Sequence, residues 1–443
     1  MSNAPPPRQP AKRKRGVILS TRGWQRLQAA EARSSQQQHP GKPYTLQELS
    51  ERTELSPNTL ARVRSRKVAV DQHTLENYFR AFDLMLSPED YTDSDNLPFN
   101  RQSLLATGQL SIDSPFYVYR PPIETLCYEA LMQPGALVRV KAPRQMGKTS
   151  LVSRVLTQLR EQHHHTAIIS LQLADASVLT DLRRFLQWFC AIVSQSFGLP
   201  NQLDRHWDDL FGNSYNCTNY FENYILTEIT DPIVLALDEV DSVFEHPEIA
   251  ADFFGMLRAW YEKSRYGDAK SELWQKLRLV LIHSIEVYVP LHLNQSPFNA
   301  GLLVELPTLN TEQVLDLAQR YGFEDLETAA EALLNLTGGN PYLVQVGLHH
   351  LSLQSVSIEA LLRSTTSDGV YGNHLRNLLW DLQKYPELMA ALRRVVFSDA
   401  PVEVEPIQAF KLQSKGLVRM RNSLISPSCE LYRQFFQQAL STS

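Results

Sequence analysis

The stretch KAPRQMGKTS, residues 141–150, decides the fold of this chain. It follows an apolar run, GALVRV, that is typical of a buried strand, and it leads into LVSRVLTQL, whose apolar residues have helical spacing. From Ala142 to Thr149 the pattern is A-x-x-x-x-G-K-T, the phosphate-binding P-loop pattern with Ala in place of the first Gly. That Ala costs little if it keeps strand-like dihedrals, because only a positive φ demands glycine. The stretch therefore predicts a strand, a phosphate-binding loop and a helix, in that order.

The loop has the chemistry needed to hold a nucleoside triphosphate. Backbone N–H groups of residues 145–149 would surround the β-phosphate at a helix N-terminus, where the helix dipole also favours an anion. Gly147 permits close approach, Lys148 would reach the β- and γ-phosphates, and Thr149 would ligate Mg²⁺. We therefore expect ATP and Mg²⁺ as cofactors. The loop residues expected to contact them are Ala142, Arg144, Gln145, Met146, Gly147, Lys148, Thr149 and Ser150.

Two acids about 90 residues downstream complete this prediction. In DPIVLALDEVDSVF (231–244), five apolar residues end in Asp238 and Glu239. Asp238 would bind Mg²⁺, directly or through water, and Glu239 would orient and activate the attacking water. The alternative is a helix-capping acid followed by a surface acid. An acid pair after a buried strand, downstream of a P-loop, is far more specific than either element alone.

Further strands predict the sheet. KLRLVLIHSIEVYV (276–289) is apolar except for polar residues that include His283 and Ser284, and LLVELP (302–307) would be the fifth strand. Ser284 or His283 could sense the γ-phosphate, although either could also be a hydrogen-bonded core residue. Strands that alternate with helices indicate an α/β fold with a five-stranded, mainly parallel sheet and the site at its C-terminal edge.

The N-terminal region predicts an all-α helix-turn-helix domain. Residues 1–80 hold 15 Lys or Arg against 6 Asp or Glu, although the whole chain has a net charge of −5, so an anionic partner would bind at this end. Thr45 and Glu48 form a capping box for one helix, and Ser56 caps a second helix that starts at Pro57. The second helix of such a motif enters the DNA major groove. The residues expected to contact bases or phosphates are Asn58, Thr59, Arg62, Arg64, Arg66 and Lys67.

The stretch ELSERTELSPNTLARV resembles the repressor-type helix-turn-helix. The motif also serves as a protein adaptor, so that role stays open beside DNA binding. The chain is then expected to divide into a disordered basic arm, the helix-turn-helix domain, a linker, a P-loop ATPase core, a helical lid and a winged-helix domain, at residues 1–15, 16–92, 93–113, 114–308, 309–365 and 366–443. In the last domain, cations at Lys411, Lys415, Arg419 and Arg421 could touch nucleic acid.

Five stretches together resemble the bacterial AAA-like domain ATPases, relatives of the AAA+ and STAND signalling NTPases. They are SPFYVYRPPIETLCYEAL, KAPRQMGKTSLVSRVL, LDEVDSVF, HSIEVYVPLHLNQSPFNAGLLVELP and TGGNPYLV, within residues 114 to about 355. The resemblance implies an ATP-driven conformational switch. It also implies that Tyr117 and Arg120 contact adenine and that Pro341, after Asn340, belongs to the lid motif near the base. Asn340 and Pro341 could equally mark a helix stop and the next helix start.

Two further features of the resembling ATPases concern catalysis and regulation. Arg258, on the helix after the acidic strand, could be an arginine finger for a neighbouring subunit, although an exposed Arg on an amphipathic helix is the commoner case. STAND proteins often place a His of the last domain against the nucleotide, and the sequence displays no convincing equivalent. The resemblance also implies that the winged-helix module closes over the nucleotide or contacts partners more often than it binds DNA.

Composition bears on the location of the protein and on the presence of metal sites or disulfides. No apolar run approaches the ~20 residues needed to span a bilayer, so we expect a cytoplasmic protein with no membrane partner. The four cysteines are scattered, which argues against a zinc site or a disulfide framework.

The leading hypothesis is an ATP-dependent regulatory switch that binds DNA, forms a homo-oligomer on ATP binding and acts on an unknown protein effector. The alternatives are a multimeric regulator of a mobile-element or defence system, and an interaction scaffold that binds nucleotide without turnover.

Overall fold

The fold is taken from a computed structural model, which describes residues 16–38, 44–53, 55–65, 70–93, 109–284, 296–323, 326–353, 356–363 and 369–441. The chain divides into two compact units, residues 1–101 and 102–443, and each is described by itself. The basic arm expected at residues 1–15 lies outside the described residues, as do Arg66 and Lys67. Among the helices of the described parts, none is long and apolar enough to cross a membrane.

The N-terminal unit contains the two capped helices that its sequence predicts. Thr45 and Glu48 form two reciprocal hydrogen bonds. The Thr45 N–H donates to the Glu48 carboxylate (2.7 Å), and the Glu48 N–H donates to the Thr45 hydroxyl (3.3 Å). The Ser56 hydroxyl accepts the Thr59 N–H at 3.1 Å. The unit is not all-α, because β1 and β2 pair antiparallel. Its elements are β1 (Val17–Leu19), α1 (Thr21–Gln38), α2 (Leu46–Thr53), α3 (Pro57–Ser65), α4 (Gln72–Arg80) and β2 (Tyr91–Asp93).

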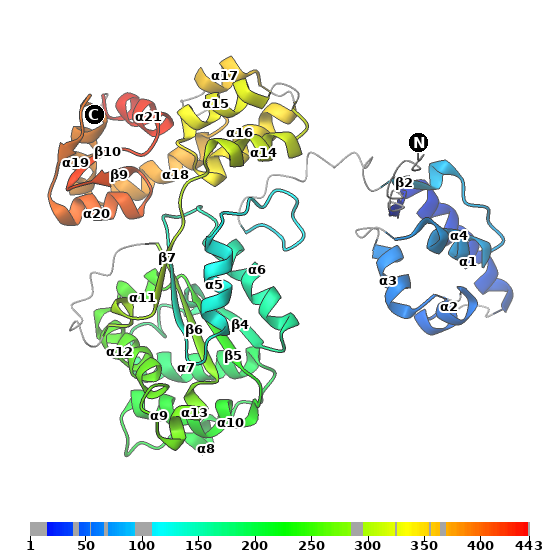
Figure 1. Ribbon diagram of the computed structural model, residues 1–443, viewed down its shortest axis with the longest axis horizontal. Helices are drawn as coiled ribbons and strands as arrows, with labels where there is room; N and C mark the ends of the chain where they lie inside the picture. The colour runs from blue at the N-terminus through cyan, green and yellow to red at the C-terminus, as the bar shows by residue number, and fades with distance from the viewer. Residues whose placement is uncertain are drawn as a thin grey trace, which may run out of the picture. The chain divides into compact units, whose positions relative to one another are not determined.

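The second unit is built on a five-stranded sheet in which every strand pairing is parallel. The strand order is β4-β5-β6-β3-β7, so β6 separates the P-loop strand β3 from the acidic strand β5. This order confirms the expected P-loop sheet, to which β4 adds a strand that the sequence pattern did not single out (Figure 1). The strands are β3 (Leu137–Lys141), β4 (His165–Ser170), β5 (Ile233–Asp238), β6 (Leu277–His283) and β7 (Leu302–Glu305).

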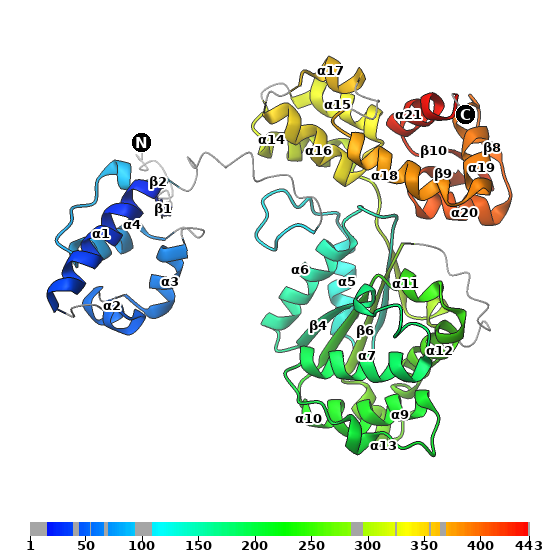
Figure 2. The ribbon, with the colours of Figure 1, turned by 180° about the vertical axis from the view of Figure 1, so that it is seen from behind.

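The central strands are apolar on both faces because both faces are covered by helices. Leu235 and Leu237 of β5 pack into one core with α7 and α12, whereas Val234 and Ala236 pack into another with α5 and α6. Accordingly α5 lies in front of the sheet in Figure 1 and α7 lies in front of it in Figure 2. The helices are α5 (Ile123–Met132), α6 (Lys148–Glu161), α7 (Leu182–Ser196), α8 (Leu203–His206), α9 (Asn213–Tyr220), α10 (Leu226–Glu228), α11 (Asp241–Phe244), α12 (Pro247–Lys263) and α13 (Ala269–Trp274).

The C-terminal part of this unit is helical with one small sheet. Its helices share a single apolar core that runs through both regions expected as lid and winged helix. The small sheet is antiparallel, in the order β8-β10-β9. The elements are α14 (Thr311–Arg320), α15 (Leu326–Thr337), α16 (Pro341–Ser352), α17 (Ile358–Arg363), α18 (Gly372–Gln383), α19 (Pro386–Val396), β8 (Val402–Glu403), α20 (Pro406–Ser414), β9 (Val418–Arg421), β10 (Leu424–Pro427) and α21 (Glu430–Ser441).

Candidate functional site

The P-loop joins β3 to α6 with the backbone that the motif requires. Gly147 caps α6 with φ +90°, and a Cβ built on it would lie 3.1 Å from Nη2 of Arg120. A side chain at this position would therefore be strained and would crowd the loop. Gln145 also has a positive φ (+66°), whereas Ala142 does not, which agrees with the tolerance of Ala at the first motif position.

Lys148 lies over the loop and reaches the end of the central strand. Its ammonium donates to the carbonyls of Ala142 (2.8 Å) and Pro143 (3.1 Å) and to the hydroxyl of Ser284 (2.8 Å). Burial lowers the pKa of Lys148, nearby carboxylates led by Asp241 partly oppose the shift, the charge of Arg144 adds to it, and the resulting pKa is about 8. The ammonium is thus desolvated and held where an anion above the loop could replace its carbonyl partners.

The loop and the acidic strand meet at the predicted metal ligands. The Thr149 hydroxyl donates to Oδ2 of Asp238 at 2.7 Å, and Asp238 is 7% exposed. These two oxygens are hard donors of the kind that Mg²⁺ takes together with substrate phosphates. The donor set at the C-terminal end of β5 therefore fits the ion.

Two further acids and two hydroxyl residues lie at the ends of the neighbouring strands. Glu239 has φ +58°, and its carboxylate accepts a hydrogen bond from Ser170 at the end of β4. Asp241 was not among the expected site residues, although it belongs to the same LDEVD stretch. Its carboxylate accepts the backbone N–H of Ser284 at 3.0 and 2.9 Å, so it fixes the residue that contacts Lys148.

The segment before α5 supplies the two residues expected near the base. Arg120 is 4% exposed and donates from Nη1 to the carbonyl of Met146 in the P-loop at 2.8 Å. Tyr117 donates from its hydroxyl to Glu124 at 2.8 Å, and burial together with that carboxylate raises its pKa. Both residues are held rigidly beside the loop.

Residues expected to be linker also take part. The Leu110 N–H donates to the hydroxyl of Ser150 at 3.1 Å, and Arg154 of α6 donates to the carbonyl of Ser111 at 2.8 Å. Gln109 and Leu110 line the same cavity as the P-loop. The polar, weakly periodic sequence did not indicate this packing, because the contacts are hydrogen bonds from backbone atoms and one polar side chain, Gln109, and not an apolar face.

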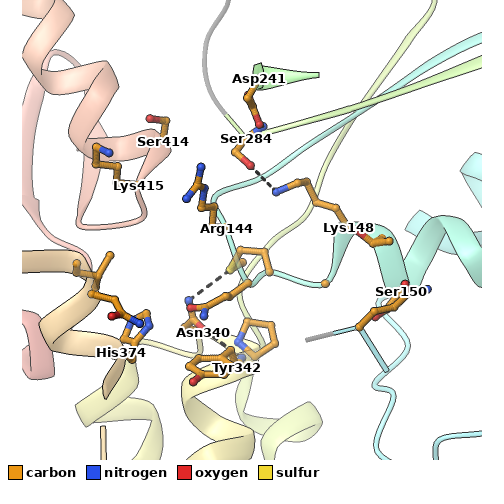
Figure 3. A pocket seen from close by; sticks show the side chains of 18 of the residues that line it. Arg144, Lys148, Ser150, Asp241, Ser284, Asn340, Tyr342, His374, Ser414 and Lys415 are labelled. Carbon is orange, nitrogen blue, oxygen red and sulfur yellow. Dashed lines mark hydrogen bonds between the residues drawn. The ribbon is translucent and has the colours of Figure 1, made fainter. Parts of the chain in front are cut away.

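One cavity of about 1190 Å³ brings most of the expected residues together (Figure 3). From the lid, Asn340 caps α16 by accepting the N–H of Tyr342 at 3.0 Å, and its amide approaches the sulfur of Met146 at 3.8 Å. Ala142, Asp238 and Glu239 do not line the cavity. Ala142 accepts a hydrogen bond from Lys148 and Asp238 accepts one from Thr149, and both of these donors line it. The expected residues that line the cavity are Tyr117, Arg120, Arg144, Gln145, Met146, Gly147, Lys148, Thr149, Ser150, Ser284 and Pro341.

The opposite wall comes from α18, α20 and α21 of the last domain, where the sequence had suggested Lys411 and Lys415 only as nucleic-acid contacts. His374 of α18 contacts the hydroxyl of Tyr432 (2.7 Å) and its ring stacks on that of Tyr432. Burial lowers the pKa of His374 to about 4. Thus a C-terminal His does lie in this cavity, although the sequence displayed no convincing equivalent. Asp381, Lys411, Ser414 and Lys415 also belong to this wall.

The remaining expected residues lie elsewhere. Arg258 is tied to Glu262 of its own helix at 2.7 Å and lines a different pocket. In the N-terminal unit the side chain of Arg62 is exposed. Arg64 forms an ion pair with Glu31 (3.1 Å) and donates to the hydroxyl of Tyr78 (2.8 Å) within the unit.

Comparison with known proteins places this geometry in a family. The family model for the AAA-like domain matches residues 105–438. No curated protein matches the chain in sequence. Among solved structures, a Walker-type ATPase of Pyrococcus abyssi has a TM-score of 0.54 at 12% identity, covering 75% of this chain and 99% of its own. The Aeropyrum pernix ORC1 protein, solved in complex with DNA, has a TM-score of 0.40 at 13% identity, covering 77% and 96%. The chain therefore belongs to the AAA-like domain family and has the P-loop NTPase fold.

Proposed function

We propose that the protein is a cytoplasmic ATP-binding and ATP-hydrolysing switch. The observation that carries the proposal is the 2.7 Å bond between Thr149 and Asp238, which joins the P-loop to the acidic strand. A hydroxyl and a carboxylate at this spacing can share one divalent ion, and Lys148 lies beside them. When bound there, Mg²⁺ would neutralise charge on the β- and γ-phosphates.

The chain's own residues then have distinct roles. The amides after Gln145 and the ammonium of Lys148 bind phosphate, and Ser284 holds that ammonium at the end of β6. Glu239 would accept a proton from the attacking water once its carboxylate leaves Ser170. Tyr117 and Arg120 form the side of the cavity expected to receive the base.

Two variants separate binding from turnover. Lys148→Ala should abolish ATP binding, whereas Glu239→Gln should preserve binding and block hydrolysis, because only Glu239 acts on the water. Isothermal titration with ATP and a phosphate-release assay measure the two effects. Glu262→Gln, which alters a carboxylate of α12 outside the site, is the matched control and should change neither. Equal loss of ATP affinity in Lys148→Ala and Glu239→Gln would contradict these roles.

We further propose that the N-terminal unit binds DNA through α3. The support is the pair of capped helices α2 and α3, the exposed side chain of Arg62 and the basic charge of this end of the chain. Arg62→Ala combined with Lys67→Ala should weaken binding to duplex DNA and flatten its salt dependence. Arg22→Ala, which removes an exposed cation paired with Glu89, is the control. An unchanged gel shift in the double variant would contradict the proposal.

In this proposal, whether ATP or ADP is bound would control either the self-assembly of the protein or its action on an effector protein. If the protein acts as a multimeric regulator of a mobile element or defence system, mass photometry on duplex DNA will show ATP-dependent oligomers. If it is a scaffold that binds nucleotide without turnover, wild-type protein will bind ATP and release no phosphate, with or without DNA.

A further inference from the structure

The C-terminal part of the second unit touches the P-loop directly. The turn between α20 and β9 contains Gly416, whose φ is +76°. A Cβ built on Gly416 would lie 3.2 Å from Cβ of Pro143 in the P-loop, which is tighter than ordinary van der Waals contact. The positive φ therefore favours glycine, and the approach of this turn to Pro143 leaves little room for a side chain. The residue immediately before it, Lys415, is therefore brought to the phosphate-binding loop by a close-packed contact.

Lys415 faces the cavity of the P-loop. It lines the same cavity as Lys148 and Arg144, and Figure 3 shows Arg144 between the other two side chains. The ammonium of Lys415 forms a close ion pair with Asp381 of α18, and the two side chains are 22% and 34% exposed. The wall that faces the P-loop thus carries a cation neutralised by a carboxylate.

Asp381 is surrounded by positive charge. Besides Lys415, the ammonium of Lys384 lies 3.7 Å from its other oxygen. Burial alone would raise the pKa of Asp381, but the bond to Lys415 and the charges of Lys384 and Arg144 lower it below its usual value. Arg144 also acts electrostatically on Lys148, so its charge reaches both walls of the cavity. The carboxylate of Asp381 thus accepts from these cations the same kind of charged interaction that a phosphate oxygen would accept.

We propose that Lys415 is a specificity-determining residue of this site, which contacts the terminal phosphate of a nucleoside triphosphate in exchange for Asp381. The inference rests on the proposed nucleotide site. A triphosphate offers Lys415 and Arg144 an anion that carries more charge than one carboxylate, so the exchange is favourable. A diphosphate lacks the terminal group and leaves the Lys415–Asp381 pair intact. The C-terminal part of the chain thereby distinguishes the two nucleotides within one subunit.

The decisive variant is Lys415→Met in the full-length protein, because Met keeps the length of the stem and removes the charge. Titration calorimetry with Mg²⁺ and a non-hydrolysable ATP analogue should show a Kd raised about 10- to 100-fold, the loss expected for a hydrogen bond to a charged group. The Kd for ADP should change less than about twofold. Lys384→Met is the matched control, since Lys384 pairs with the same Asp381 but does not line the cavity. It should alter neither affinity.

A second variant tests the exchange itself. Asp381→Asn should tighten binding of the triphosphate analogue more than that of ADP, and this gain should vanish when Lys415→Met is also present. Equal effects of Lys415→Met on both nucleotides, or no effect on either, would overturn the inference. So would a loss confined to duplex DNA binding, which would make Lys415 a nucleic-acid contact.

The inference and the proposed nucleotide site can fail separately. If Lys148→Ala loses both nucleotides while Lys415→Met keeps the preference for triphosphate, only the role of Lys415 is wrong. If Lys148→Ala keeps full affinity for both nucleotides, the proposed site itself is wrong.

Discussion

Low pH should destabilise α18, which forms part of the cavity wall. The lowered pKa of His374 determines how large this loss of stability is. Burial between the rings of Tyr342 and Tyr432 lowers the pKa of His374 from 6.5 to about 4. The neutral imidazole is therefore favoured in the folded state. As the pH falls below 6.5, His374 binds a proton in the unfolded state but not in the folded state. Acidification therefore lowers the free energy of unfolding.

The magnitude follows from the difference between the pKa of His374 in the unfolded and folded states. A tenfold change in proton affinity corresponds to about 1.4 kcal/mol, so the full loss, reached below pH 4, is about 3 kcal/mol. At pH 5 the unfolded histidine is almost fully protonated and the folded one is mostly neutral, which gives a loss of about 2 kcal/mol relative to pH 7.5. That is a large fraction of the stability of an ordinary domain.

Amide hydrogen exchange of α18 in the full-length protein measures this loss. The free energy of opening at pH 7.5 and 5.0, corrected for intrinsic exchange rates, is compared between wild type and His374→Phe. Phe lacks the bond to Tyr432, so the variant will have a different opening free energy at both pH values. Because Phe does not titrate, the opening free energy of the variant should fall between pH 7.5 and 5.0 by about 2 kcal/mol less than that of the wild type. His349 and His350, whose pKa values burial also lowers, are present in both proteins and cancel. Identical pH differences in the two proteins would refute the reasoning.

Three further predictions concern single contacts. Thr149→Val keeps the shape of the side chain but removes the oxygen that faces the metal site, so the enhancement of ATP affinity by Mg²⁺ should fall at least about tenfold in titrations with and without the ion. Ser170→Ala frees the carboxylate of Glu239 and should raise the basal rate of phosphate release up to about tenfold, since the lost bond is to a charged group. A rate unchanged or lowered would contradict this. Arg64→Met leaves the carboxylate of Glu31 without its ion pair and should lower the opening free energy of α1 and α4 by about 1–3 kcal/mol in hydrogen exchange, with Arg62→Met as the exposed control.

The sequence was most informative where a local pattern carries its own chemistry. The P-loop motif requires the positive φ that Gly147 supplies, and a run of apolar residues ending in Asp238, downstream of a P-loop, favours a strand that presents its acid at the sheet edge. Capping residues such as Thr45 and Ser56 likewise act on their own helix. These predictions needed no knowledge of distant partners.

The small sheet of β1 and β2 escaped prediction because its strands are short and lie more than 70 residues apart. Arg64, expected to contact bases or phosphates, is also held by a carboxylate from α1, a contact that residue spacing in α3 does not reveal. The end of the expected linker packs on α6 through backbone groups of Leu110 and Ser111 and one Gln109 side chain, which leave no apolar pattern in the sequence.

The sequence alone determined the order of strand, phosphate loop and helix, and the acids that accompany them, because those features depend on residues close together in the chain. Only the tertiary structure decided that α18 and α20 supply the far wall of the cavity. The sequence suggested Lys415 only as a nucleic-acid contact and did not suggest His374 at all, because their positions depend on the packing of a C-terminal core against the distant P-loop. Such long-range contacts arise from shape and burial of whole elements, which a one-dimensional pattern does not encode.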